Sequence, residues 1–311
     1  MNISGIIHLV LALVLAPLLL GVINRTKAGF GGRVGPPLFQ AYYDLWKLLH
    51  KGAVYSKTTT WVFRAGPIVA LAAILTALLL LPFGGVAALM AFPGDLILLA
   101  YLLGLARFFT VLAALDTGSS FEGMGASREV FFSTLTEPAL LLSLAAAAHL
   151  TLGAGALGVS LSGIHAALSG AAWGKAGLPL GLVCLALLVV LLVENCRIPF
   201  DDPNTHLELT MIHEVMVLDH GGPDLAFILY GAALKVWLFG ALLLGLVMPT
   251  TGWPVADSIF ALAGMFALAV TVGVVESTMA RLRLLRVPQL LVGASALALL
   301  AFILELSGGL R

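Results

Sequence analysis

Residues 178–224 read LPLGLVCLALLVVLLVENCRIPFDDPNTHLELTMIHEVMVLDHGGPD, and this stretch sets the class of fold. It begins as an apolar run and becomes densely charged from Glu194 onward. The charged part holds seven of the sixteen acids and three of the seven histidines, with Arg197 as its only basic residue. About 20 apolar residues let a helix cross the hydrocarbon core. Ionisable groups beside a bilayer usually serve ion pathways or partner contacts. The stretch therefore predicts a membrane helix followed either by a functional charged segment or by a solvated loop.

The same apolar pattern recurs along the whole chain. The composition is 60% hydrophobic and 10% charged, with a mean hydropathy of +1.08, which is typical of polytopic membrane proteins. We predict an all-α polytopic membrane protein in which residues 1–311 form a single membrane domain. The first apolar run lacks a preceding basic region, so it is expected to be a retained helix rather than a signal peptide. The predicted crossings are residues 3–23, 62–82, 96–116, 130–152, 178–196, 224–249, 257–280 and 288–306. Between the fourth and fifth, residues 153–177 are expected to hold a short interfacial helix.

Basic residues predict the orientation of these crossings. With eight crossings, twelve Lys and Arg residues fall on the side of the first loop and two on the other side. Cytoplasmic loops carry such an excess of basic residues. We therefore expect a multi-pass protein of the cell inner (cytoplasmic) membrane, with 24–61 and the acidic loop 197–223 cytoplasmic and both termini on the other side. The net charge of zero indicates no nucleic-acid partner.

The first loop contains an amphipathic pattern in residues 36–52. Apolar residues recur there at helical spacing, namely Leu38, Tyr42, Leu45 and Leu49. Such a helix is expected to lie along the membrane face in contact with lipid. It either packs over the helix bundle or forms part of a cavity roof or a docking surface for a soluble partner.

Two basic residues lie inside predicted crossings. Arg107 is near the centre of the third and Lys235 near the centre of the sixth, where each costs about 2.5–3.5 kcal/mol unless it meets a carboxylate or water. They either pin helices together or tune an ion path. The candidate partners are Glu129, Glu137, Glu208 and Glu214.

Local signals divide the charged block further. The Asn195–Pro199 segment ends the fifth crossing, because the residue before proline disfavours helix geometry. Thr205 with Glu208 three residues later forms a capping box.

His206 and His213 are two turns apart on a helix, too far to share one metal ion. Chains of Asp, Glu and His are typical of proton relays, since burial shifts their pKa values.

Cofactor signatures are not evident. Cys184 and Cys196 do not form a spaced cluster for iron–sulfur, zinc or haem. The glycine-rich segment 115–129 follows a helix rather than a strand, so it does not predict a nucleotide site. We expect no metal and no cofactor bound by this chain.

Four motifs carry a resemblance to a known family. They are RVGPPLFQAYYDLWKLLHK (33–51), LARFFTVLAALDTGSSFEGMGASREVFFSTLTEPALLL (105–142), ENCRIPFDDPNTHLEL (194–209) and ESTMARLRLLRVP (276–288). With these motifs the chain resembles the H-type membrane subunit of respiratory complex I. It is more similar to the corresponding subunit of group 4 membrane-bound [NiFe]-hydrogenases and formate-hydrogenlyase-type complexes.

The resemblance implies a non-redox subunit of an oxidoreductase complex. Iron–sulfur clusters and the [NiFe] centre would be held by the hydrogenase large and small subunits docked on the cytoplasmic face. Antiporter-like membrane subunits would adjoin it in the bilayer. Acids matching the family motifs would form a proton path, and basic residues would be their charge partners. The acids are Glu129, Glu194, Asp201 and Glu208, with Glu137 and Glu214 added from their positions. The basic partners are Arg107, Lys235, Arg197 and Arg33, the last from the first-loop motif.

Two departures from the complex I pattern favour the hydrogenase branch. The first loop reads RVGPP where complex I favours RxGPN, and DPNTHLELT replaces a run rich in Glu and Gly. We expect a membrane anchor that couples the complex to proton (or Na⁺) translocation, with no catalytic centre of its own. The alternatives are a quinone-cavity subunit of an NADH–quinone oxidoreductase, a purely structural scaffold, and a stand-alone secondary transporter.

Overall fold

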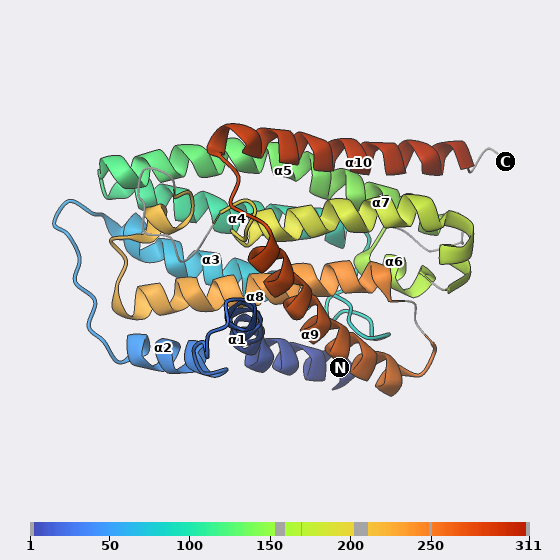
Figure 1. Cartoon of the computed structure of the whole chain (residues 1–311), viewed down its shortest axis with the longest axis horizontal. Helices are drawn as coiled ribbons and strands as arrows, with labels where there is room; N and C mark the ends of the chain where they lie inside the picture. The colour runs from blue at the N-terminus through green and yellow to red at the C-terminus, as the bar shows by residue number, and fades with distance from the viewer. Residues whose placement is uncertain (1–2, 153–158, 169, 202–210, 249–250, 309–311) are drawn as a thin grey trace.

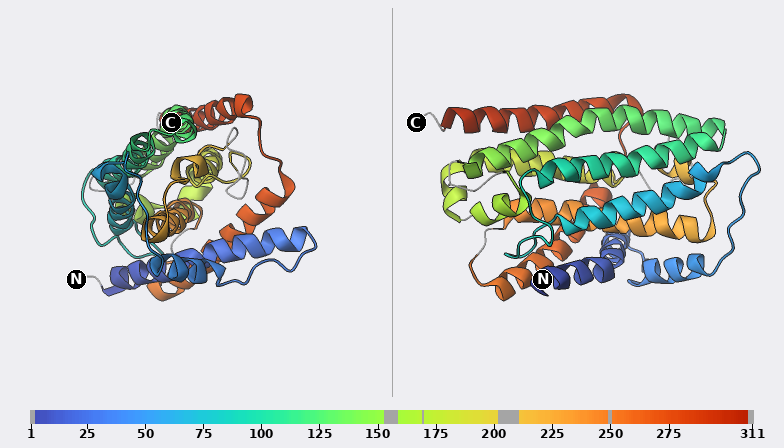
Figure 2. Two further views of the ribbon diagram at one scale, coloured as in Figure 1. Left: turned by 90° about the vertical axis from the view of Figure 1, so that its left-hand side faces the viewer. Right: turned by 180° about the vertical axis from the view of Figure 1, so that it is seen from behind.

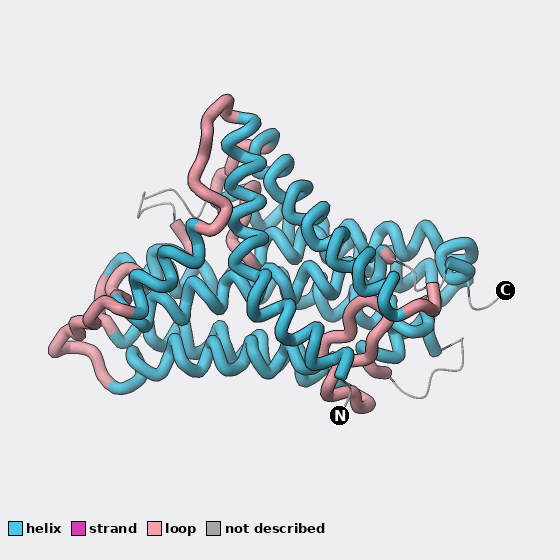
Figure 3. Tube along the Cα trace, turned by 90° about the horizontal axis from the view of Figure 1, so that it is seen from below, coloured by secondary structure: helices cyan, strands magenta, loops and turns pink. Residues whose placement is uncertain are grey.

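Eight long helices form a bundle and dominate the chain (Figure 1). The computed structural model describes residues 3–152, 159–168, 170–201, 211–248 and 251–308, and in these residues there is no strand (Figure 3). Each long helix is long and apolar enough to cross a membrane, where only internally hydrogen-bonded backbone is stable. The all-α, eight-crossing prediction is therefore confirmed. The long helices are α1 (Ile3–Phe30), α3 (Trp61–Leu79), α4 (Asp95–Asp116), α5 (Ser120–Leu152), α7 (Gly170–Glu194), α8 (Gly222–Val247), α9 (Pro254–Thr278) and α10 (Val287–Gly308).

Short helices lie between the crossings. The predicted amphipathic helix is present as α2 (Gln40–Leu49), and none of its residues is buried in this single chain. Its exposed aromatic side chains, Tyr43 and Trp46, suit a membrane interface. The short helix expected within 153–177 is α6 (Leu161–Ala167). The described residues also contain two 3₁₀ helices, η1 (Glu214–Val217) and η2 (Leu284–Arg286).

Three crossings are markedly longer at one end than the hydropathy predicts, namely α1, α5 and α7, the last of which begins at Gly170 instead of residue 178. Helix α1 continues to Phe30 instead of ending near residue 23, and α5 begins at Ser120 instead of residue 130. Hydropathy marks only the part of a helix within the hydrocarbon core, whereas tertiary contacts extend the helix beyond it. Helix α1 is held by an ion pair from Lys27 to α9. Helix α5 packs against η1 so closely that a Cβ on Gly125 would meet η1 at 2.2 Å.

Helix α8 runs through the centre of the bundle. Its Trp237 and Leu238 are fully buried and Phe239 nearly so, among side chains of the neighbouring helices. The two turned views in Figure 2 show α10 lying along α5, in agreement with the contacts between these two helices. Helix α9 crosses obliquely against α1 (Figure 1).

The segment after α7 is folded into the bundle. Helix α7 ends near the middle of the long axis, while α8 continues well past that point (Figure 1). The described residues that follow are packed between helix ends, with Phe200, Ile212 and Met216 at most 2% exposed. Most described residues of 197–223 are therefore packed within the bundle rather than forming a solvated loop, and Leu218 and Asp219 are exposed. The apolar side chains of this segment, which alternate with the charges, fill a gap that the early end of α7 leaves.

Candidate functional site

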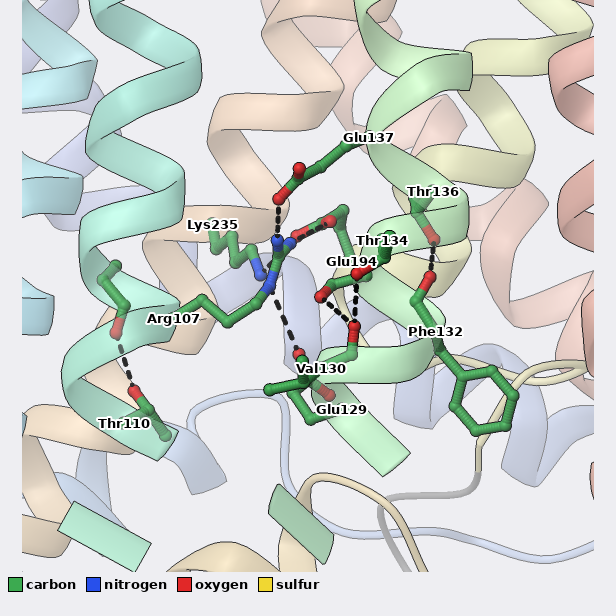
Figure 4. Close-up of polar contacts among 12 residues, drawn as sticks. Arg107, Thr110, Glu129, Val130, Phe132, Thr134, Thr136, Glu137, Glu194 and Lys235 are labelled. Carbon is green, nitrogen blue, oxygen red and sulfur yellow. Dashed lines mark hydrogen bonds and ion pairs between the residues drawn. The ribbon is translucent and has the colours of Figure 1, made fainter. Parts of the chain in front are cut away.

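A cluster of five charged side chains runs from the interior of the bundle to its outer surface. Arg107 comes from α4, Glu129 and Glu137 from α5, Glu194 from the last residue of α7, and Lys235 from α8. The residues of α4 and α8 around Arg107 and Lys235 are mostly apolar, so burying either positive charge in the membrane without a partner would cost free energy. Figure 4 shows the Arg107 guanidinium between Glu137 on one side and Glu129 on the other. Four crossings that are far apart in sequence therefore meet at one polar point.

Arg107 contacts all three acids. Its Nη1 lies 2.8 Å from Glu137 Oε1, and its Nε lies 3.6 Å from Glu129 Oε1. Its Nη2 donates a hydrogen bond to Glu194 Oε1, while Lys235 Nζ lies 2.8 Å from Glu194 Oε2. Glu194 thus joins the two basic residues through its two oxygens. It was not among the candidate partners expected for Arg107 and Lys235.

Exposure varies strongly across the cluster. The side chain of Glu194 is 4% exposed, and those of Arg107 and Glu129 are 11% and 13% exposed. Glu137 is 53% exposed on the outer surface of this chain. Three acids surround two bases, so the cluster carries one net negative charge when all five side chains are ionised. It is enclosed at Glu194 and open to its surroundings at Glu137.

A second ion-pair group lies around Glu276 of α9. The Glu276 carboxylate is completely buried, 2.7 Å from Lys27 Nζ and 3.4 Å from Arg197 Nη1. It ties α1 and the segment after α7 to α9. The sequence analysis did not select Glu276, although it lies in the fourth family motif. A lone acid near the end of an apolar helix is the signal that would have found it.

Asp201 ties the start of the charged block to a later part of the same block and to Arg281. Its Oδ1 lies 2.7 Å from Arg281 Nη2, and its Oδ2 accepts hydrogen bonds from the backbone N–H groups of Ile212 and His213 at 3.1 and 3.4 Å. The residue is 1% exposed. This arrangement gives Asp201 a structural role that its family match did not indicate.

The other predicted site residues are separate from the five-residue cluster or undescribed. Glu214 begins η1 with a partly buried side chain, and Arg33 is exposed in the turn after α1. Arg197 belongs to the Glu276 group. Glu208, the proposed capping box from Thr205, and His206 lie outside the described residues. The structure therefore brings together Glu129, Glu137, Glu194, Arg107 and Lys235.

Two buried groups within the charged block are neutral. Burial, with the nearby charges of Glu129 and Asp201, raises the pKa of the Cys196 thiol well above its usual range. His220 stacks on Phe63 with ring centroids 3.9 Å apart, and burial lowers the pKa of its imidazole. A thiol and an imidazole with these pKa values are uncharged at pH 7.

Comparison with known proteins matches the chain over nearly its full length. A family model described as NADH dehydrogenase matches residues 3–306. Formate hydrogenlyase subunit 4 of Escherichia coli (strain K12) is 32% identical, over 96% of this chain and 98% of that protein. Hydrogenase-4 component C of the same organism is also 32% identical, over 96% of this chain and 94% of that protein. A chain in the structure of the membrane-bound sulfane sulfur reductase, an archaeal respiratory membrane complex, has the same fold. Its TM-score is 0.79 at 20% identity, covering 97% of this chain and 98% of that chain.

Proposed function

Because this chain belongs to the NADH dehydrogenase family, we propose that it is the membrane anchor and the proton (or Na⁺) translocation coupling subunit of a hydrogenase-type oxidoreductase complex. The relatives named as formate hydrogenlyase and hydrogenase-4 subunits support the anchor role, since they match it from end to end. The coupling role rests on one observation, the buried cluster around Arg107.

The charge balance of this cluster suits the uptake and release of one proton. Arg107 keeps its charge at all working pH values. The three acids outnumber the two bases by one, so one added proton makes the cluster neutral. A buried cluster that gains or loses only one net charge avoids the large cost of isolated buried charge. The carboxylates are then the groups that exchange the proton, and the bases hold them together.

The burial gradient gives the path a direction. The inner acids Glu194 and Glu129 are enclosed, whereas Glu137 faces the outside of this chain from the middle of a membrane helix. A half-exposed carboxylate facing lipid is costly, and a neighbouring membrane subunit would remove that cost. We place the antiporter-like partner on this side, so that protons pass between it and Glu137.

The remaining parts of the complex follow from the proposed orientation. The basic face, with α2, would be cytoplasmic and would dock the hydrogenase large and small subunits, which hold the [NiFe] centre and the iron–sulfur clusters. The protein would lie in the inner membrane with both termini on the non-cytoplasmic side. In this arrangement the chain itself carries no electrons.

The test is proton transport by the assembled complex in vesicles. Glu194→Gln and Glu129→Gln should each lower transport per electron transferred at least tenfold, with assembly intact by size-exclusion chromatography. Glu137→Gln should lower it as well, and repeating the assay with Na⁺ identifies the ion. Glu305→Gln is the matched control, because Glu305 is also a buried acid but lies near the end of α10. Normal transport in all three cluster variants would refute the coupling role, and losses confined to assembly would support a scaffold.

A quinone-cavity subunit of an NADH–quinone oxidoreductase is the second candidate. The matching family model favours this candidate, because the model is described as NADH dehydrogenase. A quinone bound to the purified complex, or inhibition by quinone-site blockers, would favour this candidate over the hydrogenase-type role.

A further inference from the structure

We propose that Cys196, His213 and Glu129 form a binding site for a thiophilic divalent cation of the Zn²⁺ class. The site lies at the end of α7, where the charged block meets α5. Metal binding at these side chains does not depend on the proposed function. The expected effect on proton transport does, because Glu129 also contacts Arg107.

The three ligand atoms already lie close together. A thiol sulfur, an imidazole nitrogen and a carboxylate oxygen are all within 4.8 Å of one another. Tetrahedral zinc with bonds of about 2.0–2.3 Å places its ligand atoms roughly 3.5 Å apart. Side-chain rotations that move the ligand atoms by about an ångström would bring them to this spacing. Three protein ligands leave the fourth position to water, as in open zinc sites.

Each of the three groups is available to a metal. Cys196 is a free thiol, and His213 Nδ1 is buried with no hydrogen-bond partner among the described residues. Glu129 is the most distant of the acids paired with Arg107, at 3.6 Å, so it is the one most easily drawn away. Burial and the negative charges of Glu129 and Asp201 raise the pKa of the Cys196 thiol, while Lys235 lowers it, so without metal the thiol keeps its proton. Zn²⁺ would displace that proton to solvent on binding the sulfur, because a metal-bound cysteine is a thiolate.

Backbone contacts hold the two strongest ligands in place. The Cys196 N–H donates to Val193 O at 3.0 Å, and the residue adopts a left-handed conformation with φ of 52°. The His213 N–H donates to Asp201 Oδ2 at 3.4 Å, and Asp201 is itself held by Arg281. Ligands positioned in this way lose little freedom when a metal binds. The spacing of the three residues in sequence gives no sign of the site, because Glu129 lies on α5 and Cys196 and His213 are seventeen residues apart in the charged block.

Metal binding would act on the ion-pair cluster through Glu129. A carboxylate coordinated to Zn²⁺ would no longer pair with Arg107, and the path through the cluster would lose one of its enclosed acids. Zn²⁺ is therefore expected to inhibit transport by at least tenfold.

The experiment titrates Co²⁺ into the tag-free full chain in detergent and follows absorption. The wild type should bind one equivalent with a thiolate-to-cobalt charge-transfer band, and Zn²⁺ should displace it. Cys196→Ser should lose the band and His213→Gln should weaken binding at least tenfold. Cys184→Ser is the control, because Cys184 is the other free thiol, lies within α7 away from the site, and should leave the band unchanged when replaced. No stoichiometric band in the wild type, or a band that survives Cys196→Ser, would overturn the site.

Transport assays in vesicles then separate the site from the coupling role. Zn²⁺ should inhibit the wild type and should not inhibit Cys196→Ser relative to its own metal-free rate. Stoichiometric binding without inhibition would overturn the link through Glu129 while the metal site stands. Inhibition that is equal in the wild type and in Cys196→Ser would overturn the assignment of the inhibitory site.

Discussion

The ion pair between Glu194 and Lys235 gives a quantitative test of the buried cluster. Glu194 Oε2 lies 2.8 Å from Lys235 Nζ, and the two side chains are 4% and 20% exposed. Replacing Glu194 with Gln, Lys235 with Met, and both together gives a double-mutant cycle. The cycle isolates the free energy of coupling between the two residues.

The magnitude follows from the geometry. At 2.8 Å the Coulomb attraction is about 6 kcal/mol with an effective dielectric constant of about 20. Desolvation offsets much of this, and Arg107 still pairs with Glu194 when Lys235 is removed. We therefore expect a coupling free energy of about 1–3 kcal/mol. Glu194→Gln should be the more damaging single change, at about 3–5 kcal/mol, because it removes one partner of two buried bases.

The measurement is the free energy of unfolding in detergent micelles, from denaturant titrations followed by circular dichroism. A control cycle pairs Lys235→Met with Glu276→Gln, since Glu276 belongs to the separate group with Lys27 and Arg197. In the control cycle, the changes in the free energy of unfolding caused by the two single substitutions should sum to that of the double substitution within about 0.5 kcal/mol. A Glu194–Lys235 coupling below about 0.5 kcal/mol, or an equal coupling in the control cycle, would refute the assignment of this pair.

Three further predictions concern packing, protonation and the charged block. Gly125→Ala should lower stability by about 1–3 kcal/mol, because its methyl group would meet η1 at 2.2 Å. Gly123→Ala faces open space and should raise stability by up to about 1 kcal/mol. Equal unfolding midpoints for Gly125→Ala and Gly123→Ala would contradict this reasoning. Stability should fall as the pH drops below about 6.5, since burial lowers the pKa of folded His220 and the unfolded chain binds the proton first. His220→Gln should flatten that dependence, and an unchanged slope would exclude His220 as its source. Asp201→Asn should cost about 3–5 kcal/mol by breaking the pair with Arg281, and denaturant unfolding that matches the wild type would contradict it.

Local features of the sequence determined the secondary structure well. Runs of about 20 apolar residues located all eight crossings, because crossing the hydrocarbon core imposes a length that any sequence must meet. The Asn195–Pro199 segment was expected to end the fifth crossing, since the residue before proline avoids helix geometry, and α7 ends at Glu194, two residues before the predicted bound of 196. The helical spacing of apolar residues in 36–52 correctly predicted α2. Each of these signals acts between neighbours in the chain.

The sequence also indicated which charges need partners, but not all of the partners they have. Arg107 and Lys235 in apolar helices require acids, and two of the four candidate acids, Glu129 and Glu137, lie beside Arg107, although the sequence did not assign them to either base. Glu194 was expected only as a relay acid, and the structure makes it the residue that joins both bases. Helices that are apolar on all sides carry no periodic signal of which face is buried, so rotation and pairing could not be derived.

Tertiary structure decided the rest of the site. It buried the described residues after α7 within the bundle, tied Glu276 to Lys27 and Arg197, and brought Cys196, His213 and Glu129 together. Most of these contacts join residues that are dozens of positions apart in the sequence. The sequence alone determined the number of crossings and which charged residues lie within them, because the cost of placing a segment in the membrane is set by each segment separately. Only the packing of the helices decided which charges meet, since that depends on contacts among all of them at once.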